Sequence, residues 1–265
     1  MTTEQITAIH SDQSSRTTEM DVVIVNYNTR ELLRACLESL RNSDAASIVV
    51  VDNGSNDGST EMVTNEFPNV LLRAKPYSRG YGAGANSGAR LCHAPYVLVL
   101  NSDTEIPPGA IGALARYLDE HPSVGLVGPR LSNPDGSLQT SCFHFPTPFY
   151  MLTLESSLHN IAGKMPGLRN RYLPTSDHAH ARPVPWVLGA ALAMRRSVFD
   201  ELGGFDEGFF MYNEEIDLAY RVWKAGWQVH FAPVTTILHV GGASTKLHRA
   251  TMMAQLYRSR LRFYR

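Results

Sequence analysis

The chain has 265 residues, with 24 Lys and Arg against 25 Asp and Glu and a formal net charge of -1. A chain of this length can bury a full hydrophobic core as one large α/β domain. Such a balanced charge argues against general nucleic-acid binding. The three cysteines show no metal-ligand spacing, and their odd number argues against a disulfide framework, so we expect a cytoplasmic protein.

No segment of the sequence suggests a membrane span. Residues 1–20 are rich in Thr, Ser, Gln and Glu without an apolar core, so we expect a disordered lead-in and no signal peptide. The longest apolar stretch, residues 184–194, is broken by Pro185 and Gly189, and it is well short of the roughly 20 residues that a membrane helix needs. We therefore expect a soluble protein, or at most a peripheral one.

Between residues 21 and 130, short apolar runs alternate with helical patterns. Strands are expected at 22–25, 47–51, 69–74, 96–100 and 124–127, and helices at 30–42, 59–66, 83–92 and 107–121. This alternation predicts an α/β fold, with a mostly parallel, doubly wound sheet flanked by helices.

The pattern changes after residue 130. Residues 131–185 contain many prolines and histidines with little periodicity, so we expect an irregular insertion or lid. Regular structure is expected again at 186–194, with a helix at 214–225 and a strand at 235–239. Residues 249–265 combine five arginines with apolar residues, which predicts a basic amphipathic helix. A membrane surface, a homodimer contact and a solvated face all remain open for it.

Polar clusters follow three of the expected strands. These clusters are Asn26-Tyr27-Asn28, Asp52-Asn53-Gly54-Ser55 and Asn101-Ser102-Asp103. Each alone can simply cap a turn, but ligands of open α/β sheets gather outside the carboxyl ends of the strands. There Asp52 can accept a hydrogen bond from a pyrimidine N–H, Tyr27 can stack on the base, and an aspartate can hold a divalent cation against a phosphate.

A glycine-rich segment, Gly80-Tyr81-Gly82-Ala83-Gly84-Ala85-Asn86-Ser87-Gly88, invites comparison with the dinucleotide fingerprint. The match fails because residue 87 is serine where the third glycine belongs, and because the segment does not directly follow a strand. We interpret it as a close approach of the backbone to the nucleotide at a helix start, with Arg79 available to a diphosphate.

A second acidic cluster, Glu214-Glu215-Ile216-Asp217, follows an aromatic run at residues 209–212. Carboxylates at a helix N-terminus are ordinarily explained by the helix dipole, and this explanation stays open for Asp217. Two adjacent glutamates framed by aromatic residues favour a general base with a substrate-binding neighbour. His239 ends an expected strand, where imidazole can bind a divalent metal ion, although most single histidines are structural.

In this order, the motifs resemble those of family-two inverting glycosyltransferases with the GT-A fold, and among them the bacterial rhamnosyltransferases that use dTDP-L-rhamnose. The resemblance spans residues 21–244 and also includes Gly203-Gly204-Phe205-Asp206-Glu207. It implies a nucleotide-sugar-binding half at 21–130, an acceptor-binding and catalytic half of the same domain at 131–245, and a C-terminal helix at 246–265.

The resemblance also implies roles for single residues. The nucleotide site would contain Asn26, Tyr27, Asn28, Asp52, Asn53, Arg79, Gly80, Asn86, Asn101 and Ser102. Asp103 and His239 would bind Mg²⁺ or Mn²⁺, and Glu215 would be the catalytic base with Glu214 beside it. We also expect Trp186, Gly189, Tyr212 and Asp217 to face the acceptor, although ordinary core packing is an equal alternative for the aromatic residues.

Three positions depart from the family pattern. Asn101 stands at the first position of the DxD metal motif, and Ser78 stands where relatives often have asparagine. The base position holds glutamate in place of aspartate, so the choice between Glu214 and Glu215 remains open.

The implied activity is transfer of a sugar, L-rhamnose by this resemblance, to a polyprenyl-diphosphate-linked or oligosaccharide acceptor in cell-envelope synthesis, in the cytoplasm or at the inner face of the membrane. Two alternatives remain. A nucleotidyltransferase would usually carry a glycine-rich basic loop where Asn26-Tyr27-Asn28 stands. A non-catalytic sugar-nucleotide or carbohydrate-binding module would not need Glu215.

Overall fold

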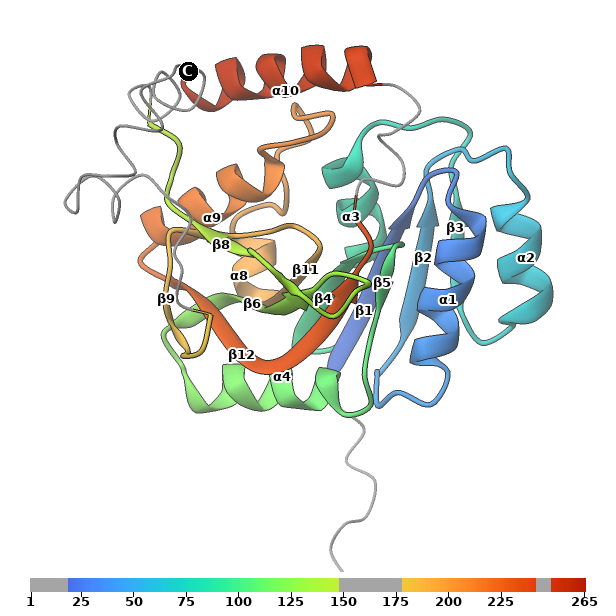
Figure 1. Cartoon of the computed structure of the whole chain (residues 1–265), viewed down its shortest axis with the longest axis horizontal. Helices are drawn as coiled ribbons and strands as arrows, with labels where there is room; N and C mark the ends of the chain where they lie inside the picture. The colour runs from blue at the N-terminus through green and yellow to red at the C-terminus, as the bar shows by residue number, and fades with distance from the viewer. Residues whose placement is uncertain (1–18, 148–177, 242–248) are drawn as a thin grey trace, which may run out of the picture.

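The computed structural model describes residues 19–147, 178–241 and 249–265 (Figure 1). The lead-in expected at 1–20 falls almost entirely outside these ranges, as does the middle of the insertion expected at 131–185. Within the described residues, no helix combines the length and the apolar composition needed to span a bilayer.

The N-terminal half forms the parallel part of the sheet. Strands β1 (Met20–Asn26), β2 (Ile48–Asp52), β3 (Leu71–Ala74) and β4 (Tyr96–Asn101) lie in the order β3-β2-β1-β4 and are joined by helices α1 (Arg30–Leu40), α2 (Ser59–Glu66) and α3 (Tyr81–Ala89). Asn26 pairs with Asp52, and Val25 pairs with Asn101. The parallel register therefore brings the polar strand ends to one edge of the sheet.

The C-terminal half extends this sheet in the order β4-β11-β6-β12-β5. Its elements are β5 (Thr104–Glu105), α4 (Ala110–Glu120), β6 (Val124–Ser132), β7 (Leu138–Gln139), β8 (Cys142–Phe143), β9 (Arg182–Pro183), β10 (Trp186–Val187), β11 (Ala191–Arg195), α8 (Arg196–Glu201), α9 (Glu214–Lys224), β12 (Gln228–His239) and α10 (Arg249–Phe263).

The sheet is mixed in this half of the chain, which is compatible with the expected mostly parallel sheet. Strand β11 runs antiparallel to both β4 and β6. Its first residue, Ala191, pairs with Leu100 at the carboxyl end of β4. The chain thus enters β11 at the edge of the sheet that carries the polar clusters. From there β11 can only run in the direction opposite to β4.

Helices cover both faces of the sheet. In β1 the side chains of Val22 and Ile24 pack into a core with α1, α2 and α4, whereas Val23 and Val25 pack into a second core with α3, α8 and α9. This two-residue alternation, with both sets buried, is what a central strand requires. The result is a three-layer α/β/α domain, which confirms the expected fold class.

Several element boundaries differ from the expected ones. The helix expected at 107–121 begins at Ala110, because Gly109 precedes it with φ 75°. The segment 186–194 divides into β10 and β11, and the strand expected at 235–239 is the end of the 12-residue β12. Helix α8 was not expected.

Helix α3 packs closely on the sheet at Gly88. A Cβ atom there would lie 2.4 Å from Val23 Cγ1 and 2.9 Å from Val51 Cγ2. We expect Gly88→Ala to lower the free energy of unfolding by about 1–3 kcal/mol through overpacking, measured by urea denaturation. Adding Val23→Ala should recover part of the loss. An unchanged midpoint for Gly88→Ala would contradict this close contact.

Candidate functional site

The carboxyl ends of β1 and β2 are joined by buried polar side chains. Asn26 donates from Nδ2 to Asp52 Oδ2 at 2.8 Å and to Ser55 Oγ at 3.2 Å. Asp52 Oδ1 accepts hydrogen bonds from the backbone N–H groups of Gly54 and Ser55. Three of the roughly four acceptor positions of this carboxylate are thus used, and one remains for a ligand.

The end of β4 joins the same cluster. Thr29 donates to Asn26 Oδ1 and lies 2.7 Å from the hydroxyl of Ser102. Asn53 donates to the carbonyl of Gly80, which connects the cluster to the start of α3. Sequence and register together therefore assemble the three expected polar clusters.

The turn after β1 exposes an aromatic side chain beside this cluster. Tyr27 is 42% exposed, and Asn28 has a left-handed backbone with φ 52°. Asn28 is held in that conformation because its N–H donates to Ser55 Oγ and its Oδ1 accepts from the N–H of Asn56. A rigid turn thus presents the ring of Tyr27 for stacking.

A carboxylate and an imidazole meet at the end of the triplet. Asp103 Oδ1 lies 3.3 Å from His239 Nε2, and both side chains are nearly buried. They meet because β5, directly after the triplet, pairs antiparallel with the end of β12, where Thr104 is opposite His239. Asn101 Nδ2 is also 3.3 Å from His239 Nε2.

A glutamine sets the orientation of the His239 ring. His239 Nδ1 lies 2.7 Å from Gln139 Oε1, while Gln139 Nε2 donates to Asn133 Oδ1 and to the His239 carbonyl. Because Gln139 Nε2 is the donor, Oε1 must accept, and Nδ1 therefore carries the proton. In this tautomer Nε2 accepts from the Asn101 amide and lies beside Asp103, so its lone pair could instead bind a metal ion.

The residues present fit a divalent cation with two protein ligands. Asp103 Oδ1 and His239 Nε2 are a carboxylate and a neutral imidazole, the ligand types that suit Mn²⁺-like ions. The second oxygen, Asp103 Oδ2, accepts from the N–H of Gly241 at 3.0 Å, which fixes the carboxylate. Among the described residues no group of three or more His, Cys, Asp or Glu could hold a metal ion, so an ion bound by this pair would need further ligands.

The two glutamates lie in different environments at the start of α9. Glu214 is buried, and its Oε2 has no hydrogen-bond partner within the described part of the chain. Glu215 is partly exposed and lies beside Gly189. A Cβ atom added at Gly189 would be 3.8 Å from Glu215 Cδ. Only Glu215 is therefore accessible to an acceptor, and this difference favours it as the base.

Burial also makes both glutamates weaker acids. It raises the pKa of Glu215 from 4.5 to about 7, although the nearby backbone N–H groups at the helix start lower it. Burial, followed by repulsion from Glu215, raises the pKa of Glu214 well above its usual range. A carboxylate with a pKa near 7 is suited to proton abstraction at neutral pH.

Tyr81 connects the glycine-rich segment with the glutamates. Its hydroxyl donates to the Gly189 carbonyl at 3.2 Å, and burial raises its pKa, with Glu214 and Glu215 adding to the effect. Its ring packs edge-on against Phe205. The backbone N–H of Tyr81 donates to the carbonyl of Phe210, so α3 begins against the loop that leads to α9.

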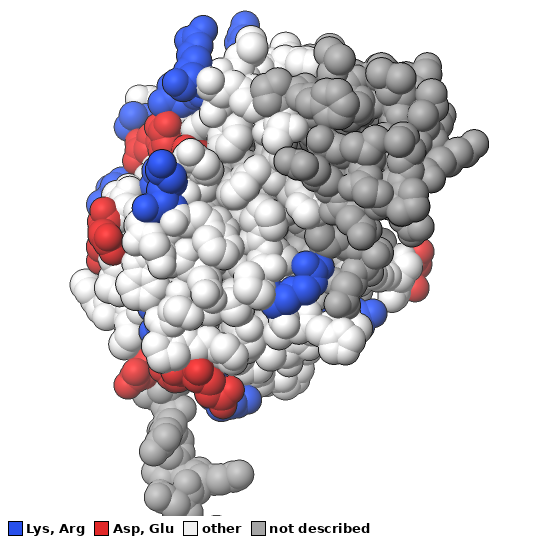
Figure 2. Space-filling view, turned by 90° about the vertical axis from the view of Figure 1, so that its left-hand side faces the viewer, with Lys and Arg blue, Asp and Glu red and all other residues white. Residues whose placement is uncertain are grey.

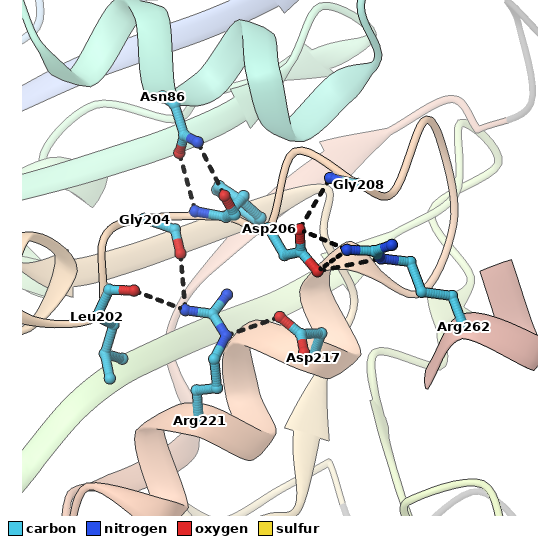
Figure 3. A network of polar contacts seen from close by, with 9 residues as sticks. Asn86, Leu202, Gly204, Asp206, Gly208, Asp217, Arg221 and Arg262 are labelled. Carbon is cyan, nitrogen blue, oxygen red and sulfur yellow. Dashed lines mark hydrogen bonds and ion pairs between the residues drawn. The ribbon is translucent and has the colours of Figure 1, made fainter. Parts of the chain in front are cut away.

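Some of the expected nucleotide residues are engaged elsewhere. The Asn86 amide exchanges two hydrogen bonds with the backbone of Phe205, at 2.8 and 2.9 Å, and also donates to Glu207 (Figure 3). Arg79 is largely exposed and lies 3.6 Å from Glu207. The structure therefore uses Asn86 to hold the loop before α9.

Two of the expected acceptor residues also have structural partners. Asp217 forms a 2.7 Å ion pair with Arg221, whose guanidinium donates to the Leu202 and Gly204 carbonyls (Figure 3). Trp186 stacks on Phe143 and donates to a backbone carbonyl through Nε1.

The other two expected acceptor residues lie close to the glutamates. Gly189 faces Glu215. Tyr212, just before the helix, has φ 68° and is followed by Asn213 with φ 67°. Two successive non-glycine residues in the left-handed region mark a strained turn into α9.

Sequence reasoning missed four polar residues of the site: Thr29, Ser55, Tyr81 and Gln139. Ser55 and Tyr81 stand inside motifs that drew attention for other residues. Thr29 lies immediately after Asn28. Gln139 has no sequence signal, because only the fold brings β7 against the end of β12.

The described fold and its strand-end site are those of a GT-A glycosyltransferase. The model of the family described as Glycosyl transferase family 2 matches residues 21–203. An N-acetylglucosaminyl-diphospho-decaprenol L-rhamnosyltransferase of Mycobacterium tuberculosis is 32% identical over 260 residues, covering 91% of this chain and 82% of the relative. The chain therefore belongs to glycosyltransferase family 2, as its motifs indicated, and is a glycosyltransferase.

More distant proteins extend the comparison. Rhamnosyltransferase WbbL of Escherichia coli is 21% identical, with 82% of each chain covered. The structure of GalNAc-T7 with UDP, GalNAc and Mn²⁺ has a TM-score of 0.60 at 17% identity, over 83% of this chain and 43% of that one. A Pyrobaculum calidifontis mannosyltransferase with GDP-Man and Mn²⁺ has a TM-score of 0.58 at 20% identity, over 92% of this chain and 64% of that one. These structural similarities support the GT-A fold.

The environments of the two glutamates predict different effects of substitution. We expect Glu215→Gln to lower kcat by about 10²–10⁴-fold, and Glu214→Gln to lower it less, because Glu214 is buried. The wild-type rate should rise with pH through about 7 as Glu215 loses its proton. Equal losses for the two variants in steady-state assays would contradict the assignment of Glu215.

Glu215 should also make stability depend on pH. Its pKa is higher in the folded state than the 4.5 of an unperturbed glutamate, so the folded protein binds more protons between about pH 4.5 and 7. The free energy of unfolding should therefore fall as pH rises through this window. Urea titrations at several pH values should show a flatter dependence for Glu215→Gln.

The Gln139 contact predicts a role in fixing the His239 tautomer. Gln139→Leu should leave Nδ1 without its acceptor, so ¹⁵N NMR of the His239 ring should report a mixture of tautomers in place of one. Leu138→Gln, at the exposed neighbouring position, is the matched control and should keep a single tautomer. An unchanged ring spectrum in Gln139→Leu would refute the role.

Proposed function

We propose that this protein transfers L-rhamnose from dTDP-L-rhamnose, with inversion, to a hydroxyl group of a polyprenyl-diphosphate-linked acceptor. The observation that carries the proposal is the partly exposed Glu215, with a pKa of about 7, at an edge that also holds the Asp103–His239 pair. The sugar and the acceptor class are those in the name of the Mycobacterium tuberculosis relative, and the dTDP carrier is the one that the sequence resemblance implies. Such an acceptor would place the protein in the cytoplasm at the inner face of the cell membrane.

The nucleotide binds at the ends of β1, β2 and β4 in this proposal. Tyr27 stacks on the pyrimidine, and the remaining acceptor position of Asp52 receives a base N–H. Asn28, Asn53, Gly80 and Ser102 shape the surrounding wall, and Asn101 faces the metal pair. Arg79, which is exposed, can turn from Glu207 toward the diphosphate.

Asp103 and His239 would hold Mn²⁺ or Mg²⁺ together with the donor diphosphate. When bound, the ion would stabilise the charge that develops on the leaving diphosphate. Gln139 keeps the His239 Nε2 lone pair available, and the Gly241 N–H fixes the Asp103 carboxylate.

Glu215 acts as the base. Its carboxylate takes the proton of the acceptor hydroxyl while that oxygen attacks the anomeric carbon from the face opposite the diphosphate. The bond from the anomeric carbon to the diphosphate oxygen breaks, and its electrons leave with dTDP. Burial, followed by repulsion from Glu215, raises the pKa of Glu214, which reduces its tendency to carry a negative charge beside Glu215.

A donor screen with purified full-length protein tests this proposal. The acceptor is N-acetylglucosamine linked through diphosphate to a short polyprenol, and the readout is release of dTDP, UDP or GDP. We expect turnover with dTDP-L-rhamnose to exceed that with other donors, to stop with EDTA and to return with Mn²⁺. Asp103→Asn should impair it, whereas Glu120→Gln, at an exposed position of α4, should not.

Other outcomes point to other functions. Turnover that survives chelation would overturn the metal assignment. Tight binding of a sugar nucleotide without turnover for any donor would favour the binding module, and release of inorganic pyrophosphate from a nucleoside triphosphate would favour a nucleotidyltransferase.

A further inference from the structure

The C-terminal helix α10 is fixed in its rotation by its inner face. Ser259 is 2% exposed, and its hydroxyl donates to the Met211 carbonyl at 2.7 Å. Arg262 forms a two-pronged ion pair with Asp206 (Figure 3). Phe263 packs edge-on against Tyr220 of α9. These contacts determine which side of the helix faces outward.

The outward side carries a continuous apolar stripe. Met253 is 50% exposed, Tyr257 45%, Leu261 64% and Tyr264 40%. The spacing of four residues puts Met253, Tyr257 and Leu261 on one helix face, roughly opposite the face that holds Ser259. Tyr264 follows the helix, and its hydroxyl donates to the Pro146 carbonyl at 3.0 Å. Exposed aromatic and long aliphatic side chains in a row are unusual on a face that meets only water.

The same helix is strongly basic. It contains Arg249, Arg258, Arg260 and Arg262 with no acidic residue, and Arg265 follows it. By helical spacing, Arg258 and Arg265 fall on one side of the apolar stripe and Arg260 on the other. Figure 2 shows basic side chains projecting at the top of the molecule, where α10 lies in Figure 1. Apolar residues bordered by arginines on both sides are typical of helices that lie in a membrane interface.

The helix also lies on the side of the molecule that carries the site. In Figure 1 it lies along the top of the domain above α9, and the arrowheads of β1 and β2 also point toward the top. Its partners Asp206 and Met211 belong to the loop that runs directly into Glu214 and Glu215. A surface seated on α10 would therefore be next to the acceptor side.

We propose that the outer face of α10, formed by Met253, Tyr257 and Leu261 with the flanking arginines, docks on an anionic lipid bilayer. The apolar stripe inserts among the lipid chains near the headgroups, and the guanidinium groups bind lipid phosphates. Docking holds the acceptor side against the bilayer, so that a lipid-linked acceptor reaches Glu215 without leaving the membrane. Only this last step rests on the proposed function.

Vesicle flotation of the full-length protein tests the proposal. Wild type should float with vesicles of phosphatidylglycerol and phosphatidylcholine but not with phosphatidylcholine alone, and added salt should weaken the binding. Arg258→Gln should lower the partition coefficient roughly fivefold, and Leu261→Glu should lower it about tenfold or more. Matched controls on other surfaces, Arg116→Gln in α4 and Leu71→Glu in β3, should bind like wild type.

The outcomes separate this proposal from its alternatives. Circular dichroism and thermal melting verify that each variant is folded. Absent binding of wild type, or equal binding of the α10 variants, would overturn the proposal. A wild-type dimer that Leu261→Glu converts to a monomer, without vesicle binding, would assign this face to a second copy of the chain. Vesicle binding without turnover on any donor would leave docking intact and refute the proposed function.

Discussion

The short antiparallel pairing between β5 and the end of β12 is the contact on which the site depends. It sets Thr104 opposite His239 and so brings His239 against Asp103. Asp103 lies in the turn after β4, and β4 is separated in the sheet from β12, which carries His239, by β11 and β6. The polar ends of β1, β2 and β4 lie at the same edge of the sheet. The pairing of β5 with β12 therefore places the Asp103 carboxylate, the His239 imidazole and the Asn101 amide close together at this edge.

A second constraint acts on the loop that precedes α9. Placing two adjacent glutamates here, with Glu214 buried and Glu215 partly buried, is unfavourable, and Tyr212 and Asn213 are strained before them. The loop is clamped from three sides, by the Asn86 amide, by the guanidinium of Arg221 and by Arg262 of α10 (Figure 3). These contacts hold the two glutamates in surroundings that raise their pKa values. Such surroundings cost folding stability but suit a catalytic base.

The sequence predicted the N-terminal half better than the C-terminal half. Each buried strand there is followed by its own helix, so local patterns specify both the elements and their parallel direction. After residue 130 the strands are short, and the direction of β11 depends on where the chain re-enters the sheet. The site followed the same division: Asn26, Asp52 and Ser102 were predictable from strand ends, whereas Gln139 depends on a distant pairing.

The sequence by itself determined the α/β class, the three polar strand ends and the family, because these depend on periodicity and on motifs that are local. The tertiary structure decided which glutamate is accessible, since Glu214 and Glu215 are adjacent in sequence and differ only in what packs around them. It also decided that Asn86 holds a loop and that α10 presents its apolar stripe outward. Burial and hydrogen-bond partners are properties of the packed chain, so no local pattern contains them.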